Sequence, residues 1–256
     1  MSGHSHARTI RHQKNLTDQK RGQIFSKMAR MISVAVKEGG ANPETNSKLR
    51  IAIETARSFN MPSENIERAI KRATGEIPGE KLEEVFYEAY GPGGIAIIIE
   101  GITDNKNRAL GEIKQILSQR NGKLVKEGTV KWMFERKGCI TVNIKNQKLA
   151  PYRNEVSGAG SNIKNKEDLE ILAIEAGAED LYWYNDSLDV YINIEDLGTV
   201  KKNLEEKGVK IDSTSLDWKP KEMIDLKEKE KESCLKLFEA LDESESVQEI
   251  YSNLKA

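Results

Sequence analysis

The stretch VFYEAYGPGGIAIIIE, residues 85–100, decides the fold class, because two strand-like segments flank a turn made of glycine and proline. Residues 85–90 and 95–100 are rich in β-branched and aromatic side chains, which favour strands. The GPGG tetrapeptide between them could also suggest a phosphate-binding loop. Such loops run from a strand into a helix and continue with Lys-Ser/Thr, whereas this one is followed by a second strand. Gly and Pro supply turn dihedral angles, so the sequence predicts a β-hairpin.

Helix and strand patterns alternate after the hairpin. A helix is predicted at about 105–120, and its buried face would carry Leu110, Ile113 and Leu117. The segment TVKWMFER then alternates as a strand does, and one side would carry Val130, Trp132 and Phe134. By themselves these elements leave an incomplete α/β unit.

The sequence after residue 138 has the order of a ferredoxin-like domain, β-α-β-β-α-β. Its segments are CITVNI, a helix around 167–176, LYWY, LDVYIN, a helix around 196–207, and VKIDSTSL. The C-terminal helix at about 226–241 and the strand-like VQEIYSNL would complete the earlier unit. We therefore expect an α/β domain formed by 79–137 plus 214–256, with a ferredoxin-like domain, 138–213, inserted in it. Residues 146–166 lack periodicity and are predicted to form a mobile surface loop.

Residues 1–78 are predicted to form a basic arm and a three-helix bundle. The first helix, from Thr17 to Lys37, would end at Gly39-Gly40. The third would begin with Ser63 as N-cap and end at Gly75. The predicted fold class is α+β, with an N-terminal three-helix domain followed by two ferredoxin-like α/β domains, the third inserted in the second.

The composition is that of a soluble globular protein, with 32% charged and 38% hydrophobic residues. The longest apolar run, Ile95 to Ile99, is too short to span a bilayer, and no secretory signal pattern follows the basic start. Cys139 and Cys234 lack CxxC spacing, which indicates reduced thiols in a cytoplasmic protein. No membrane partner, cofactor or small-molecule substrate is expected.

The net charge of −1 hides a strong asymmetry along the chain. Residues 1–72 carry 14 Lys and Arg against 6 Asp and Glu, whereas residues 73–256 carry 26 against 35. A basic end of this kind suggests contact with a polyanion through phosphate groups, although runs of charge are also common on merely solvated faces. The candidate nucleic-acid contacts are His4, Arg8, Arg11, His12, Lys14, Lys20, Arg21, Lys27, Arg30, Lys37, Arg68, Lys71 and Arg72.

The three histidines of the chain lie in the basic arm, at positions 4, 6 and 12. A metal site would normally recruit carboxylates or thiolates as well, and none precedes Asp18. Histidines that face water or phosphate are therefore the favoured interpretation, and no metal is expected. The arm has no apolar face, so we expect it to become ordered only on the nucleic acid.

A second polar cluster lies where a predicted strand ends, at Asp104, Asn105, Asn107 and Arg108. Capping of the following helix explains it most simply, and a ligand site is the alternative. Trp132, Trp183 and Tyr184 are expected in core or half-buried faces rather than on a base-stacking platform, because basic residues do not accompany them. We find no nucleophile with a nearby base, so an enzyme is not predicted.

These motifs together resemble the YebC-type family of probable transcriptional regulators, whose organellar relatives are known as translational activators. The resemblance extends over nearly the whole chain. It departs from the family at His6-Ala7, where Lys-Trp is usual, and in the length of the 146–166 loop. The matching segments are Gly3-His4-Ser5, Ile10, Arg21-Gly22, Phe25-Ser26-Lys27, Lys37-Glu38-Gly39-Gly40, Asn60-Met61-Pro62, Asn65-Ile66, Arg68-Ala69-Ile70-Lys71-Arg72, Tyr90-Gly91-Pro92-Gly93-Gly94, Thr103-Asp104-Asn105, Asn107-Arg108, Trp132-Met133-Phe134, Ala176-Gly177-Ala178-Glu179-Asp180 and Trp218-Lys219-Pro220.

The resemblance implies the three-domain architecture and a non-enzymatic regulator of gene expression. The leading hypothesis is a DNA-binding transcriptional regulator. The alternative is a translation factor that docks on the ribosome through rRNA. No helix shows a helix-turn-helix signature or a row of side chains suited to base edges, which fits shape recognition of either nucleic acid.

Overall fold

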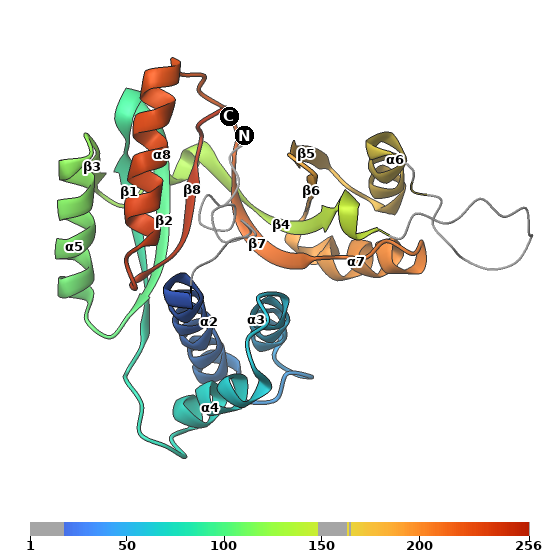
Figure 1. The fold of residues 1–256 in the computed structure, drawn as a ribbon, viewed down its shortest axis with the longest axis horizontal. Helices are drawn as coiled ribbons and strands as arrows, with labels where there is room; N and C mark the ends of the chain where they lie inside the picture. Colours follow the sequence, from blue (N-terminus) through green and yellow to red (C-terminus); the bar gives the residue numbers. More distant parts are fainter. Residues whose placement is uncertain (1–17, 148–162, 164, 256) are drawn as a thin grey trace, which may run out of the picture. The chain divides into compact units, whose positions relative to one another are not determined.

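The structure is a computed structural model that describes residues 18–147, 163 and 165–255, with side chains from Arg21 onward. Its contacts divide the chain into two compact units. One contains the described residues up to Glu135 together with those from Trp218, and the other is Arg136–Asp217. The predicted basic arm and most of the predicted 146–166 loop lie outside the described residues (Figure 1).

Three helices form the N-terminal part of the first unit: α2 (Asp18–Gly39), α3 (Ser47–Ser58) and α4 (Ser63–Thr74). Both α3 and α4 pack on α2, and their shared core includes Met28, Ile32, Leu49, Ala56 and Ile66. Gly40 and Gly75 have φ angles of 84° and 83°, so glycine ends α2 and α4 as predicted. The predicted N-cap role of Ser63 is wrong: Pro62 is the cap residue and no side chain caps α4.

A four-stranded antiparallel sheet follows in the same unit, in the order β3-β1-β2-β8. Figure 1 shows helices α5 and α8 side by side on one face of this sheet. Their common core is almost entirely apolar, with Ile97, Ile99, Leu117 and Phe238 fully buried. The elements are β1 (Glu83–Tyr90), β2 (Ala96–Thr103), α5 (Lys106–Gln119), β3 (Lys123–Val125), α8 (Glu228–Asp242) and β8 (Val247–Ser252).

The predicted hairpin is confirmed, since β1 and β2 pair antiparallel on either side of the GPGG turn. Gly93 and Gly94 in this turn have φ angles of 69° and 78°, a region that glycine adopts without steric cost. The predicted C-terminal completion is also confirmed, because α8 and β8 contribute to the same core as β1, β2 and α5.

The strand predicted for TVKWMFER begins later than expected. Residues 131–133 form a short 3-10 turn, and β4 (Phe134–Asn143) starts only at Phe134. The expectation that Trp132 shares a buried side with Val130 is wrong: Trp132 is 64% exposed, whereas Val130 is fully buried. The cause lies in Glu88, whose buried carboxylate accepts the backbone N–H groups of residues 128, 130 and 131. These donors are therefore turned away from any strand partner.

The second unit has the predicted β-α-β-β-α-β order, and its sheet order β5-β6-β4-β7 is that of a ferredoxin-like fold. Its core lies between the sheet and the two helices and includes Ile140, Leu169, Val190 and Leu204. The α+β fold class is thus confirmed. After β4, the elements are α6 (Lys166–Ala176), β5 (Asp180–Tyr184), β6 (Ser187–Ile192), α7 (Leu197–Glu206) and β7 (Ser213–Pro220).

Candidate nucleic-acid interface

The clearest group of available cations lies on α4. Arg68, Lys71 and Arg72 are spaced three and four residues apart, and all three are exposed or half-exposed on one face of the helix. The Arg68 guanidinium group lies 3.4 Å from a carboxylate oxygen of Glu64, one turn earlier. An exposed ion pair of this kind contributes little to stability. Lys71 and Arg72 have no side-chain partner in the part of the chain that the structure describes. Their positive charges at the C-terminal turn of the helix are free to meet phosphate groups.

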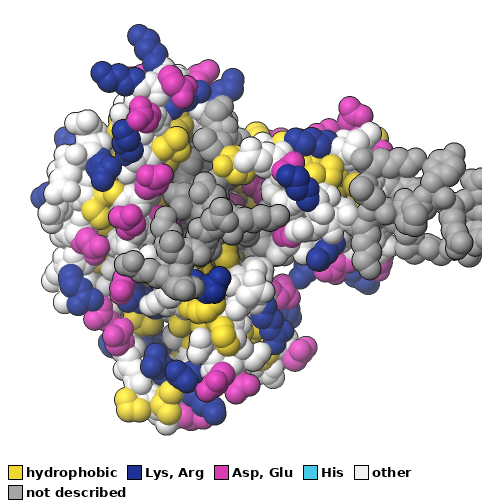
Figure 2. All heavy atoms as spheres, in the orientation of Figure 1, with side chains coloured by type: hydrophobic (Ala, Val, Ile, Leu, Met, Phe, Trp, Pro, Cys, Tyr) yellow, Lys and Arg dark blue, Asp and Glu magenta, His cyan; other side chains and the backbone are white. Residues whose placement is uncertain are grey.

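The visible face of the molecule carries both charge signs interspersed (Figure 2). On that face Lys and Arg side chains alternate with Asp and Glu, and no single large basic patch appears among the described residues.

Lys27 is not the exposed cation that the helical pattern predicted. Its side chain is 3% exposed, and its ammonium group lies 2.9 Å from a carboxylate oxygen of Asp242 at the end of α8. It also donates to the Asp242 carbonyl at 2.5 Å. The prediction of an exposed Lys27 is wrong, because one turn of α2 packs against the end of α8 instead of facing solvent.

Arg30 is held in the same way. Its guanidinium group donates to the backbone carbonyl and to the carboxylate of Glu245, in the turn between α8 and β8. The Arg30 side chain is 17% exposed and Glu245 is 68% exposed. We therefore leave Lys27 and Arg30 out of the nucleic-acid interface proposed below and assign them to the contact between the helices and the sheet domain.

Replacing Asp242 with Asn is expected to lower the free energy of unfolding by about 2 kcal/mol, because it removes the counter-charge of a buried ammonium group. Replacing Glu245 with Gln should cost less than about 1 kcal/mol, since that pair is open to solvent. Urea denaturation measures the free energy of unfolding of the two variants and shows which substitution costs more. Equal losses would show that burial does not distinguish the two ion pairs.

The remaining predicted contacts lie either on α2 or in the basic arm. Arg21 and Lys37 are exposed at either end of α2, and Lys37 donates to the Glu80 carbonyl at 3.4 Å. Lys20 lies in α2, but its side chain is not described. Arg57 on α3 is a further exposed cation without a described partner, which the sequence pattern did not single out. The arm residues His4, Arg8, Arg11, His12 and Lys14 lie outside the described residues.

The second polar cluster caps α5. The Asn105 side chain accepts the backbone N–H of Arg108 at 3.1 Å, and the Arg108 guanidinium group pairs with the Asp104 carboxylate. The capping interpretation is therefore confirmed. Asn107 instead lines a shallow hollow between α5 and β1. Leu110, predicted in the core, lines the same hollow and is 38% exposed.

Trp183 and Tyr184 are half-buried on β5, as expected. The Trp183 indole lies under the Lys166 ammonium group, 4.5 Å from the ring centroid, and donates to the Glu170 carboxylate at 2.5 Å. Because this indole already has an anionic partner beside it, it is poorly suited to stack on a nucleobase.

Both cysteines are buried, and they are not joined in a disulfide. Burial raises the pKa of the Cys234 thiol to about 11, with a smaller contribution from the nearby charge of Glu230. This thiol therefore stays protonated at neutral pH, in a form that is a poor nucleophile. Among the residues with described positions, no group of three His, Cys, Asp or Glu side chains is placed to hold a metal ion, and no helix is long and apolar enough to cross a membrane.

Comparison with known proteins gives consistent matches over the whole chain. A profile described as the TACO1/YebC protein N-terminal domain matches residues 5–76, and one described as the TACO1/YebC second and third domain matches residues 82–254. A crystal structure of a conserved hypothetical protein from Aquifex aeolicus has a TM-score of 0.82 and 42% identity, covering 96% of this chain and 95% of that one.

Curated relatives are similar over comparable lengths. A probable transcriptional regulatory protein of Prosthecochloris aestuarii is 43% identical over 100% of this chain and 96% of its own length. One of Caldanaerobacter subterraneus is 44% identical over 100% of this chain and 98% of its own length. The fold defines a class of α+β proteins in which a helical domain precedes a sheet domain that carries a ferredoxin-like insertion. Within that class, the chain belongs to the TACO1/YebC family.

Proposed function

We propose that this protein is a non-enzymatic, nucleic-acid-binding regulator of gene expression that acts on DNA in transcription. The observation that carries the proposal is the stripe of Arg68, Lys71 and Arg72, of which two cations lack any described partner. The names of the curated relatives, probable transcriptional regulatory proteins, support the same role.

The proposed interface joins this stripe to Arg21, Lys37 and the cations of residues 1–20. Contacts of Lys and Arg to phosphate give affinity through charge and counterion release, with little reading of base sequence. We therefore infer that the protein recognises the backbone or shape of its target. The carboxylates of Glu64 and Glu67 on the first turns of α4 keep anions away from that end of the helix.

A nuclease experiment tests the choice of nucleic acid. When a cell lysate is fractionated by sedimentation, we expect the protein to travel with the nucleoid and to be released by DNase but not by RNase. Release by RNase together with co-sedimentation with ribosomes would contradict the transcriptional role and favour a translation factor that binds rRNA. Release by neither nuclease would contradict nucleic-acid binding in both forms.

A further inference from the structure

Strand β1 has one edge that is only partly paired. It pairs with β2 over its whole length, Glu83–Tyr90, whereas β3 pairs only with its last three residues, Glu88–Tyr90. Nothing among the described residues pairs with the outer side of Glu83–Tyr87. An open strand edge presents backbone donors and acceptors to which another extended chain can add.

The alternation of the ladder shows which backbone groups are open. The Gly91 N–H donates to the Ile95 carbonyl at 2.9 Å, so hydrogen-bonded pairs between β1 and β2 fall on every second residue counted back from Gly91. Val85 and Tyr87 therefore direct their N–H and C=O groups toward β2. Glu84 and Phe86 direct theirs outward, away from the sheet.

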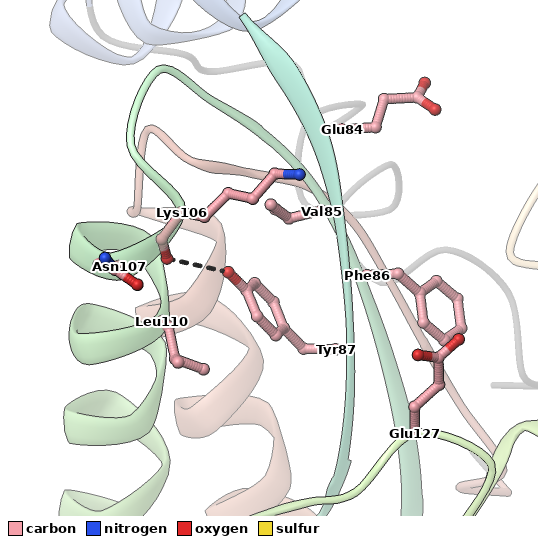
Figure 3. A pocket seen from close by; sticks show the side chains of 8 residues that line it. All are labelled: Glu84, Val85, Phe86, Tyr87, Lys106, Asn107, Leu110 and Glu127. Carbon is pink, nitrogen blue, oxygen red and sulfur yellow. Dashed lines mark hydrogen bonds between the residues drawn. The ribbon is translucent and has the colours of Figure 1, made fainter.

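A hollow of about 320 Å³ lies along this open edge. Figure 3 shows that its lining comes from both sides of β1: Tyr87 and Leu110 lie on the α5 side, and Phe86 and Glu127 on the other. The Tyr87 hydroxyl donates to the Lys106 carbonyl at 3.4 Å, which ties β1 to the first turn of α5. Since side chains alternate along a strand, a chain added to this edge would send successive side chains to the two sides in turn.

The two sides differ in chemistry. On the α5 side, Leu110 is 38% exposed beside the ring of Tyr87, so an apolar side chain would be covered there. On the other side, Glu127 is exposed and has no ion-pair partner within the described ranges, and it lies by the ring of Phe86. This side favours Lys or Arg through the Glu127 carboxylate alone, because the Lys131 ammonium group already lies over the ring of Phe86, 5.2 Å from its centroid.

The neighbouring charges are already engaged. Lys106 pairs with Glu83 at 2.7 Å, and Lys48 pairs with Glu84 at 2.7 Å. A second copy of this edge would bring no available cation to Glu127, because Lys106, the one lysine that lines the hollow, is paired with its own Glu83. The charge pattern therefore favours a basic partner over self-association or a nucleic acid.

We propose that the edge Glu83–Tyr87 binds an extended segment of another protein by strand addition to β1. The segment spans about five residues and alternates apolar side chains toward Leu110 with Lys or Arg toward Glu127. This surface is separate from the cationic stripe of α4, so the proposal does not depend on nucleic-acid binding. It gives the protein a second kind of partner.

The test uses the full chain and two peptides, acetyl-Lys-Leu-Lys-Val-Lys-amide and its counterpart with Glu in place of Lys. We expect the basic peptide to bind and to slow hydrogen exchange at the amides of Glu84 and Phe86. The amides of Val85 and Tyr87 should change little, because they are already bonded to β2. Absence of binding, or binding without protection at Glu84 and Phe86, would overturn the proposal.

Matched variants locate the site. Leu110→Asp should weaken binding of the basic peptide by about tenfold or more, since it places a charge where an apolar side chain is covered. Leu235→Asp on α8 is the control, because Leu235 is equally exposed at 37% and does not line the hollow. Glu127→Lys should shift the preference toward the acidic peptide. Equal effects of the two Asp variants would contradict the proposed site.

Self-association is checked with the same proteins. In sedimentation velocity, we expect the wild type and Leu110→Asp to show the same oligomeric state. A wild-type oligomer that is lost in Leu110→Asp is not expected. If the wild type does show one, a second copy of the chain is the occupant of the β1 edge and the proposal of a basic partner segment is wrong.

Discussion

Replacing Arg68, Lys71 and Arg72 together with Gln should weaken binding to duplex DNA on the order of 100-fold at physiological salt, if each side chain binds one phosphate group. The slope of log K against log salt should become shallower by about 0.9 for each phosphate group that is no longer neutralised. The folded state should be nearly as stable as before, because none of the three side chains is buried in the core of the helical domain. A salt titration of DNA binding, with thermal melts alongside, measures both quantities.

A matched variant separates local contacts from net charge. Lys114, Arg120 and Lys126 are exposed cations of the sheet domain without described side-chain partners, and changing them to Gln alters the net charge by the same amount. This control should keep nearly the wild-type affinity and slope. If both triple variants bind DNA equally weakly, the α4 stripe is not a specific contact surface and only the overall charge matters.

A second variant tests whether the basic arm contributes to DNA binding. Changing Arg8, Arg11, Lys14, Lys20 and Arg21 to Gln is expected to reduce affinity and salt slope with little change in the melting temperature, since no residue of the described core is altered. Unchanged binding would limit the interface to the helices. A large fall in the melting temperature would show that the arm has a structural role.

Replacing Glu88 with Ala should lower the free energy of unfolding by about 4 kcal/mol. The Glu88 side chain is 1% exposed and accepts the N–H groups of Gly128 at 2.6 Å, Val130 at 2.6 Å and Lys131 at 2.9 Å. Without the carboxylate, three backbone donors in this segment have no acceptor. Glu88→Gln should cost about 2 kcal/mol, because the amide keeps one acceptor oxygen but brings an N–H₂ group toward backbone donors.

Urea denaturation followed by tryptophan fluorescence measures this destabilisation, since Trp132 and Trp218 lie close to the segment that Glu88 holds. Glu127→Gln, an exposed glutamate next to the same segment, serves as the control and should change stability by less than about 0.5 kcal/mol. A Glu88→Ala protein as stable as this control would show that the three hydrogen bonds do not hold the segment.

Local patterns predicted most elements of the fold. The GPGG turn between two β-branched segments predicted the hairpin, because glycine and proline restrict where the chain can reverse. Helix periodicity and glycine C-caps placed α2 and α4 near their observed ends, and the order of segments after residue 138 predicted the ferredoxin-like domain. In each case the signal is carried by residues close together in the sequence.

The errors at Trp132 and Leu110 have a common origin in contacts between distant residues. Trp132 is exposed because Glu88, more than forty residues earlier, takes the backbone donors that a strand would have used. Leu110 has the spacing of a core residue but faces the open edge of β1, since β3 covers only the last part of that strand.

The division between sequence and tertiary structure is clearest for the cations of the helical domain. The sequence by itself determined that residues 1–72 are basic and that Arg68, Lys71 and Arg72 share one helix face, because charge and helical spacing are local properties. Only the tertiary structure decided which of these cations are exposed and available to bind phosphate groups. It brings Asp242 and Glu245 to Lys27 and Arg30, about 215 residues away, since α2 packs against the end of α8, and it leaves Lys71 and Arg72 in solvent.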